Sequence, residues 1–206
     1  MIFVIDCETT GIGKLDQVVQ LATIRVPDSI ALLKNSFVVA KPFGCAGVRK
    51  QSPYFPVLVV TNSYFNPSVP INKHAQAVHG LSKIQLCKYP STKECSLHPS
   101  TRIVVGHNVS FDTRMLKIQL PSICTMNLAK KIEKLQGGKF GFENYKLTTM
   151  FAFYYPELVK QFESEVHDAL GDCEMALLVL IALLKEFPFL TTLTEVQKYF
   201  FTKDTI

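Results

Sequence analysis

The sequence predicts an α/β fold in which a mixed β-sheet is flanked by α-helices. Two observations indicate this fold: β-rich apolar runs come first along the chain, and later short strands are mixed with helical segments. With 206 residues, 48% of them hydrophobic, the chain is long enough to bury a sizeable core. We therefore expect one domain over residues 1–206, with a core of about 1–187 and a C-terminal extension at 188–206.

Apolar and β-branched residues mark the first two strands. The apolar run at residues 2–5 predicts a strand that carries Asp6 and Glu8 at its C-terminal end. Residues 18–26 are rich in valine, isoleucine and threonine and predict the second strand, which the Pro-Asp-Ser sequence at 27–29 ends.

The position of the third strand stays open between two segments. Residues 36–40 and 57–65 are both β-rich, and both are bounded by proline or glycine. Residues 43–56 are expected to form an inserted loop.

The middle of the chain alternates between helix and strand. A short helix is expected over residues 72–78, ended by Gly80, and residues 102–106 predict a compact buried strand. Ser110 is a plausible N-cap for the next helix, which would extend to Gln119.

The rest of the chain is mainly helical. After a short strand at 123–124, helices are expected over about 126–135 and 145–155. The longest helix should cover about 168–187, because Pro188 stops it and its residues are apolar on all sides.

Composition excludes several classes of protein. The six cysteines include no Cys-x-x-Cys pair, so neither a zinc site nor a disulfide framework is expected. The longest apolar run, residues 175–184, is shorter than the roughly 20 residues of a membrane span. We expect a cytoplasmic protein with reduced thiols and no membrane segment. A net charge of +5 favours polyanions weakly, although an ordinary lysine-rich surface has the same charge.

Asp6 and Glu8 are the first candidate ligands. Because alternate residues of a strand share a face, both carboxylates should point to the same side of the sheet. Such oxygen ligands suit Mg²⁺ or Mn²⁺. An Asp-x-Glu pair alone can also be a solvated strand end.

Later segments supply three more candidates. Asp112 lies in the first turns of the helix that follows the strand at 102–106, and His167 precedes Asp172 by five residues. Carboxylates that hold two metal ions, with a histidine as general base, suit in-line hydrolysis of a phosphodiester. Singly, each residue has another explanation: a helix-start acid, a capping residue, or a solvated first-turn acid.

Taken together, these residues form three motifs in a recognisable order. The chain resembles the histidine branch of the DEDD superfamily of 3′–5′ exonucleases, which includes DnaQ-like proofreading domains and RNase T. This resemblance implies an RNase H-like fold. The tyrosine branch has tyrosine where this chain has Asp168. The matching motifs are Asp6-x-Glu8-Thr9-Thr10-Gly11, His107-Asn108-x-x-Phe111-Asp112 and His167-Asp168-Ala169-x-x-Asp172.

The resemblance implies a role for each site residue. Asp6 would bridge two metal ions, which would be Mg²⁺ or Mn²⁺, and Asp112 would hold the second ion directly or through water. Glu8 and Asp172 would complete the first site, and His167 would be the general base.

Substrate contacts are also implied by the resemblance. Residues 66–81 resemble the segment that helps relatives to hold the terminal nucleotide. The residues expected to bind substrate are Glu8, Thr9 and Thr10 through backbone amides, His79 and His74 near the phosphate or sugar, and Asn108.

Residues 123–131 resemble bacterial exonuclease X, and this likeness alone favours a DNA 3′ end as the partner. The expected products of the 3′–5′ exonuclease reaction are nucleoside 5′-monophosphates. An exoribonuclease would have the same metal site, so RNA stays open as a substrate.

A catalytically silent nucleic-acid-binding module is the alternative from another class. A polymerase proofreading subunit would differ only in its partners, and no motif for a protein partner is evident.

Several other residues have weaker claims to function. His98 is expected on the surface, and His107 is expected to support its turn rather than bind a ligand. Four lysines could form a phosphate-binding strip or simply a solvated helix face: Lys130, Lys131, Lys134 and Lys139.

Overall fold

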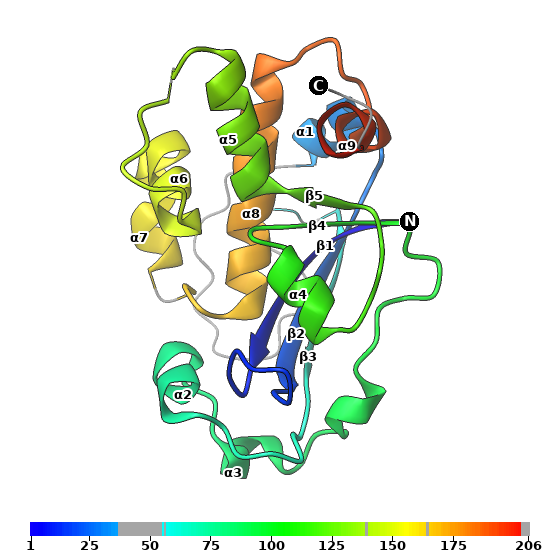
Figure 1. The fold of residues 1–206 in the computed structure, drawn as a ribbon, viewed down its shortest axis with the longest axis vertical. Helices are drawn as coiled ribbons and strands as arrows, with labels where there is room; N and C mark the ends of the chain where they lie inside the picture. Colours follow the sequence, from blue (N-terminus) through cyan, green and yellow to red (C-terminus); the bar gives the residue numbers. More distant parts are fainter. Residues whose placement is uncertain (37–54, 56, 139, 164, 203–206) are drawn as a thin grey trace.

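The computed structural model describes residues 1–36, 55, 57–138, 140–163 and 165–202 (Figure 1). Within them, five strands form one sheet in the order β3-β2-β1-β4-β5. The first three strands are antiparallel, whereas β4 and β5 run parallel to β1, so the predicted mixed sheet is confirmed. The strands are β1 (Ile2–Thr9), β2 (Val18–Val26), β3 (Val59–Tyr64), β4 (Ile103–Gly106) and β5 (Ser122–Cys124).

Helix α8 (Ala169–Leu183) is the centre of the core. It packs against the sheet on one side and against α5 (Thr125–Leu135) and α6 (Leu147–Tyr154) on another (Figure 1). Every residue of α8 except Asp172 is buried, as expected for a helix that is apolar on all sides. The helix is shorter than predicted, because a 3₁₀ turn, η3 (Leu184–Glu186), replaces its last turn.

The structure assigns the third strand to the second of the two candidate segments. Val59–Tyr64 forms β3 at the edge of the sheet, beside β2. Residues 37–40 of the other candidate, and the proposed loop at 43–56 apart from Phe55, lie outside the described residues. Helix α1 (Ile30–Asn35) was not predicted. Its N-cap is Ser29, whose side chain accepts a hydrogen bond from the Leu32 amide.

A short arm of two helices lies beyond the carboxyl end of β1, at the bottom of Figure 1. It consists of α2 (Lys73–His79), which was predicted, and α3 (Lys83–Leu86), which was not. Gly80 ends α2 in the left-handed conformation, with φ 73°, where glycine has no Cβ to clash. The amide of Asn72 donates to the Thr10 carbonyl at 2.8 Å and ties the arm to the end of β1.

Helix α4 (Ser110–Met115) corrects two predictions. Val109 takes the N-cap position without a side-chain cap, and Ser110 is instead the first helical residue, donating to Asn108 Oδ1. The helix ends four residues before Gln119, because Lys117 adopts a left-handed conformation with φ 55°.

The C-terminal region contains helices that the sequence analysis did not predict. In α9 (Leu193–Phe201), the buried side chains of Leu193, Val196 and Phe200 belong to the main hydrophobic cluster. The capping box of Thr192 and Glu195 is a sequence signal that would have revealed this helix. Two short elements precede α8: η2 (Pro156–Leu158) and α7 (Val159–Phe162).

None of the helices in the described part of the chain combines the length and apolar character needed to cross a lipid bilayer.

Candidate active site

The carboxyl end of β1 presents two carboxylates on one face of the sheet. Asp6 and Glu8 are partly exposed, whereas the intervening Cys7 is buried on the opposite face. In the ladder with β2, Glu8 lies opposite Gln20, and the register shifts directly after Glu8. A rigid central strand thus fixes both carboxylates, as the spacing of the residues predicted.

Asp112 joins this pair from α4. Its side chain is 2% exposed, and its Oδ1 accepts a hydrogen bond from the Cys7 backbone amide at 3.0 Å. This bond fastens the start of α4 to β1 between Asp6 and Glu8. The three carboxylates therefore come from two segments about a hundred residues apart in sequence.

His167 and Asp172 approach from the start of α8. His167 is exposed and has a left-handed backbone with φ 64°, and Asp172 lies in the first turn of the helix. One ligand atom from each of Glu8, His167 and Asp172 lies within 4.8 Å of the other two. This set of nitrogen and oxygen donors could hold a divalent cation. Asp6 and Asp112 are not part of this group of three.

The carboxyl groups have pKa values well above those of exposed acids. Burial, followed by the negative charge of neighbouring acids, raises the pKa of Glu8 to about 8. Burial is also the main cause that raises the pKa of Asp112 and of Asp172 to about 7. The pKa of Asp6 is raised by burial and by the charges of Asp112, Asp172 and Glu8. A bound cation would relieve this repulsion and favour the ionised carboxylates, so the residues present fit a divalent metal ion.

A cavity of about 470 Å³ opens beside Glu8, within the usual range for ligand pockets. The end of β1 and the following turn form one wall, α2 forms another, and Phe111 of α4 contributes an aromatic ring. Its lining is mainly apolar. The residues that line it are Cys7, Glu8, Thr9, Gly11, Ile12, Asn72, His74, Ala75, Val78, His79 and Phe111.

His79 connects α2 to β1. Its Nδ1 accepts a hydrogen bond from the Leu81 amide at 3.0 Å, so the proton of the neutral ring lies on Nε2, which is 3.2 Å from the Thr9 carbonyl. Burial lowers the pKa of His79, which favours this neutral form. His79 therefore has a structural contact in addition to its place in the cavity wall.

The other predicted substrate residues differ in position. Thr9 and His74 line the cavity. Thr10 and Asn108 do not: the Thr10 amide donates to the Gln17 carbonyl at 2.8 Å, and Asn108 turns the chain with φ 57°. Substrate contacts by these residues stay predictions.

His107 has the structural role that was expected. Its Nδ1 lies 2.9 Å from the Thr125 hydroxyl, and its Nε2 donates to the Tyr145 carbonyl at 2.9 Å.

Of the four lysines considered for phosphate binding, Lys131 has a partner within the protein. Its ammonium donates to the Phe200 carbonyl, which argues against a phosphate-binding role. Lys139 lies outside the described residues.

Three residues at the site were not singled out from the sequence. Ile12 and Asn72 line the cavity, and Gln20 lies opposite Glu8. Asn72 directly precedes α2 and caps it, a pattern readable from sequence. Gln20 is a polar residue on the side of β2 that Ala22 and Ile24 share, which is also a readable signal.

Comparison with known proteins supports the predicted relationship to exonucleases. The family model of the RNase T exonuclease family matches residues 57–180, which is more than half of the chain. The chain belongs to this exonuclease family. The match includes Asp112, His167 and Asp172, whereas Asp6 and Glu8 precede it. The predicted relationship to DnaQ-like 3′–5′ exonucleases is thereby confirmed.

Solved structures of exonucleases have the same fold. Exonuclease X, solved with 5′-overhanging duplex DNA, superimposes with a TM-score of 0.59 and 20% identity, over 96% of this chain and 99% of that one. The zinc-bound complex of Escherichia coli exonuclease I with single-stranded DNA gives a TM-score of 0.61 and 15% identity, over 91% of this chain but 41% of that one. These likenesses confirm the predicted RNase H-like fold. A search of curated protein sequences found no match.

Proposed function

We propose that this exonuclease depends on two divalent metal ions, Mg²⁺ or Mn²⁺, and hydrolyses DNA from the 3′ end to nucleoside 5′-monophosphates. One observation carries the proposal: Glu8, His167 and Asp172 converge within 4.8 Å beside a cavity that Glu8 itself lines. Membership of the exonuclease family supports the reaction class.

Each residue of the site has a chemical task in this proposal. Asp6 would bridge the two ions, and the first site would also include Glu8 and Asp172, while Asp112 would hold the second. Bound ions of this kind stabilise the attacking and leaving oxygens of an in-line displacement at phosphorus. A ring nitrogen of His167 takes the proton from the attacking water. Because His167 is exposed, it can pass this proton to solvent.

The cavity is suited to the last nucleotide of the strand. Its apolar wall, with Phe111, Ile12 and Val78, can hold a base or a deoxyribose, while His74 and His79 lie where they could approach a phosphate or the sugar. A preference for DNA is supported by the two structural neighbours that were solved with DNA. We also propose that residues 1–206 act as one domain in the cytoplasm, with nucleic acid as the partner. The absence of disulfides among the described cysteines is compatible with that compartment.

The decisive experiment uses single-stranded DNA and RNA of the same sequence, labelled at the 5′ end, with Mg²⁺ or Mn²⁺. We expect the DNA to shorten stepwise from its 3′ end. EDTA should abolish the shortening, and His167→Ala or Asp172→Ala should leave only a slow residual rate, measurable at high enzyme concentration. Preferential loss of RNA would identify an exoribonuclease with the same mechanism. Tight binding without hydrolysis of either strand would indicate a binding module and overturn the proposal.

A further inference from the structure

The loop that carries His167 lies between α7 and α8 and is packed against the first turn of α8. The amide of Asp168 donates to the Glu165 carbonyl at 3.1 Å. That carbonyl also lies so close to Gly171 that a Cβ there would collide with it. These contacts hold the loop to its own helix, but they do not position it relative to β1, where Glu8 lies.

Asp168 makes a direct contact with the sheet. Its Oδ1 accepts a hydrogen bond from Gln20 Nε2 of β2 at 2.6 Å, and its Oδ2 accepts one from the Gly171 amide at 3.4 Å. The Asp168 carboxylate therefore caps α8 with one oxygen and contacts the sheet with the other. Because Asp168 directly follows His167, this contact connects the loop that carries His167 to β2.

Gln20 is well placed to fix this contact. It is 1% exposed, and its Nε2 also lies 3.0 Å from Asn62 Oδ1 and 3.3 Å from the Tyr64 hydroxyl, both on β3. Gln20 also lies directly opposite Glu8 in the antiparallel ladder. Because opposite residues of such a pair project from the same face, Gln20 shares a side of the sheet with Glu8.

We propose that Gln20 is a positioning residue for His167. By holding Asp168 against β2, it sets the distance between the imidazole of His167 and the carboxylate of Glu8. The left-handed backbone of His167 supports this inference, since such a conformation in a residue other than glycine requires surrounding contacts to maintain it. The inference rests on the proposed function, in which His167 is the general base.

Two variants remove the contact from opposite sides. Gln20→Met keeps the length of the side chain without its donor. Asp168→Ser keeps a good N-cap for α8 but is too short to reach Gln20. We expect each to lower kcat on 5′-labelled DNA with Mg²⁺ on the order of 10- to 100-fold, with KM nearly unchanged, because small displacements of a catalytic group have effects of this size. The two losses should not multiply in the double variant.

A third comparison separates positioning from general damage. In a His167→Ala background, measured at high enzyme concentration, Gln20→Met should cause no further loss of rate, because the residue that it positions is gone. Thr23→Val is the matched control: it removes the 2.8 Å contact between the hydroxyls of Thr23 and Thr61, which joins the same two strands on the opposite face. We expect the control to retain wild-type kcat, and thermal melting to show that all variants fold.

The outcomes distinguish this inference from the proposed function. Two results would show that Gln20 does not position His167. In the first, His167→Ala is strongly impaired but Gln20→Met and Asp168→Ser are fully active; in the second, Gln20→Met slows the His167→Ala enzyme by the same factor as the wild type. If His167→Ala itself is fully active, the proposed general base is wrong.

Discussion

Arg114 on α4 donates from Nη1 to the backbone carbonyl of Ile12 at 3.1 Å. Its guanidinium also lies over the ring of Phe111, 5.2 Å from the centroid. Ile12 and Phe111 both line the cavity. One side chain thus joins the turn after β1 to α4 and fixes two walls of the candidate nucleotide site.

We expect Arg114→Ala to raise KM for oligonucleotides several-fold with a smaller effect on kcat, since it loosens the cavity walls and leaves the carboxylates in place. Arg114→Lys should recover only part of the loss, because lysine keeps the charge but not the planar guanidinium. Lys198→Ala on α9 removes one positive charge elsewhere and is the control. Steady-state kinetics on single-stranded DNA test this prediction, and equal effects of Arg114→Ala and Lys198→Ala would contradict it.

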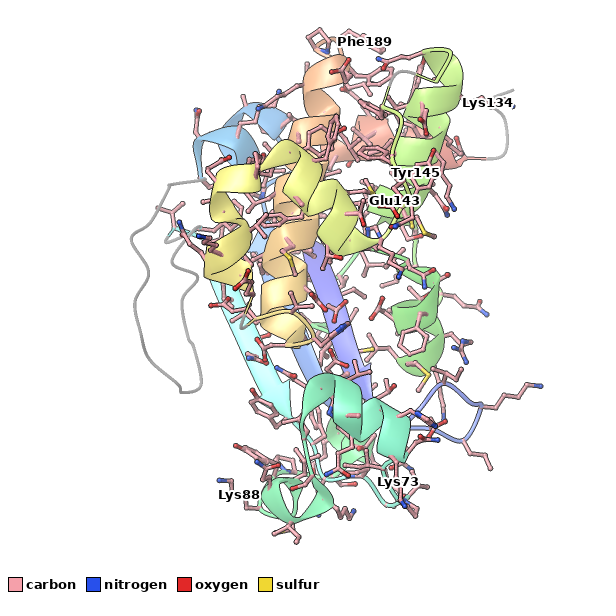
Figure 2. All side chains as sticks on the ribbon, turned by 90° about the vertical axis from the view of Figure 1, so that its left-hand side faces the viewer. Lys73, Lys88, Lys134, Glu143, Tyr145 and Phe189 are labelled. Atoms are coloured by element: carbon pink, nitrogen blue, oxygen red, sulfur yellow. The ribbon has the colours of Figure 1, made fainter. Side chains whose placement is uncertain are left out.

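The arm that contains α2 and α3 is strongly basic. Between Asp28 and Asp112 the sequence has a single acid, Glu94. Lys73 and Lys88 project from the two sides of the arm (Figure 2), whereas Lys134 lies near the opposite end of the molecule. Because nucleic-acid phosphates bind cations with release of counterions, these lysines should contribute to substrate binding and make it dependent on salt. A net charge of only +5 should leave this binding weak.

We therefore expect the double variant Lys73→Glu, Lys88→Glu to bind single-stranded DNA less tightly and with a smaller salt dependence. Each lost phosphate contact should reduce the slope of log K against log salt by about 0.7. Fluorescence anisotropy at several salt concentrations measures both quantities. The matched control is the double variant Lys134→Glu, Lys198→Glu, which changes the net charge by the same amount away from the arm. An equal loss of affinity there would mean that only net charge matters. With binding this weak, we expect distributive digestion of a long end-labelled oligonucleotide; complete digestion of some molecules while others stay intact would contradict this.

The carboxylate cluster predicts an unusual dependence of stability on pH. The pKa values of Glu8, Asp112 and Asp172 are raised to about 7–8 in the folded protein, against about 4 for exposed acids. The folded state therefore holds more protons than the unfolded state between these values. Without metal, this contribution favours folding at low pH and is lost as pH rises through 7–8.

Thermal unfolding with EDTA and with Mg²⁺ checks this prediction. We expect Mg²⁺ to raise the Tm more at pH 8.5 than at pH 6, because it binds the ionised carboxylates. Asp172→Asn should reduce this difference. A Mg²⁺ effect that is the same at both pH values would count against a metal site built from these groups.

The contribution of His107 to stability should rise with pH, whereas that of the carboxylate cluster falls. Burial lowers its pKa to about 4, and its ring bridges Thr125 and Tyr145. We expect His107→Ala to lower the free energy of unfolding by about 1–3 kcal/mol at pH 8, because a buried hydrogen-bond partner is lost. The difference from wild type should shrink as pH falls from about 6.5 to 4, where protonation favours the unfolded state. Chemical denaturation measures it, and the exposed His98→Ala should change stability little.

The parts of the site that lie on regular elements could be predicted from the sequence. Alternation along β1 placed Asp6 and Glu8 on one face, and the apolar character of α8 predicted its burial. The family motifs identified Asp112, His167 and Asp172 as candidates. The contact between Gln20 and Asp168 could not be foreseen, because it joins residues 148 positions apart through a loop whose path depends on packing.

The errors in the predicted fold had local physical causes. The Pro-Asp-Ser sequence after β2 was interpreted only as a strand breaker, although Ser29 also starts α1. Ser110 has the residue type of an N-cap, but the left-handed turn at Asn108 begins the helix one residue earlier than expected. Helix α4 ends because Lys117 adopts a left-handed backbone conformation. No proline or glycine at this position indicated the end of the helix in the sequence.

The contrast between α8 and α2 divides the site into a rigid and an adaptable half. Asp172 stands on a helix that is otherwise wholly buried, whereas α2 has no buried residue. In hydrogen exchange, amides of α8 should open only with global unfolding, while those of α2 should exchange through local opening. The carboxylates would then be in place before a strand end arrives. The wall of the cavity would become ordered around each new nucleotide and loosen again after its release.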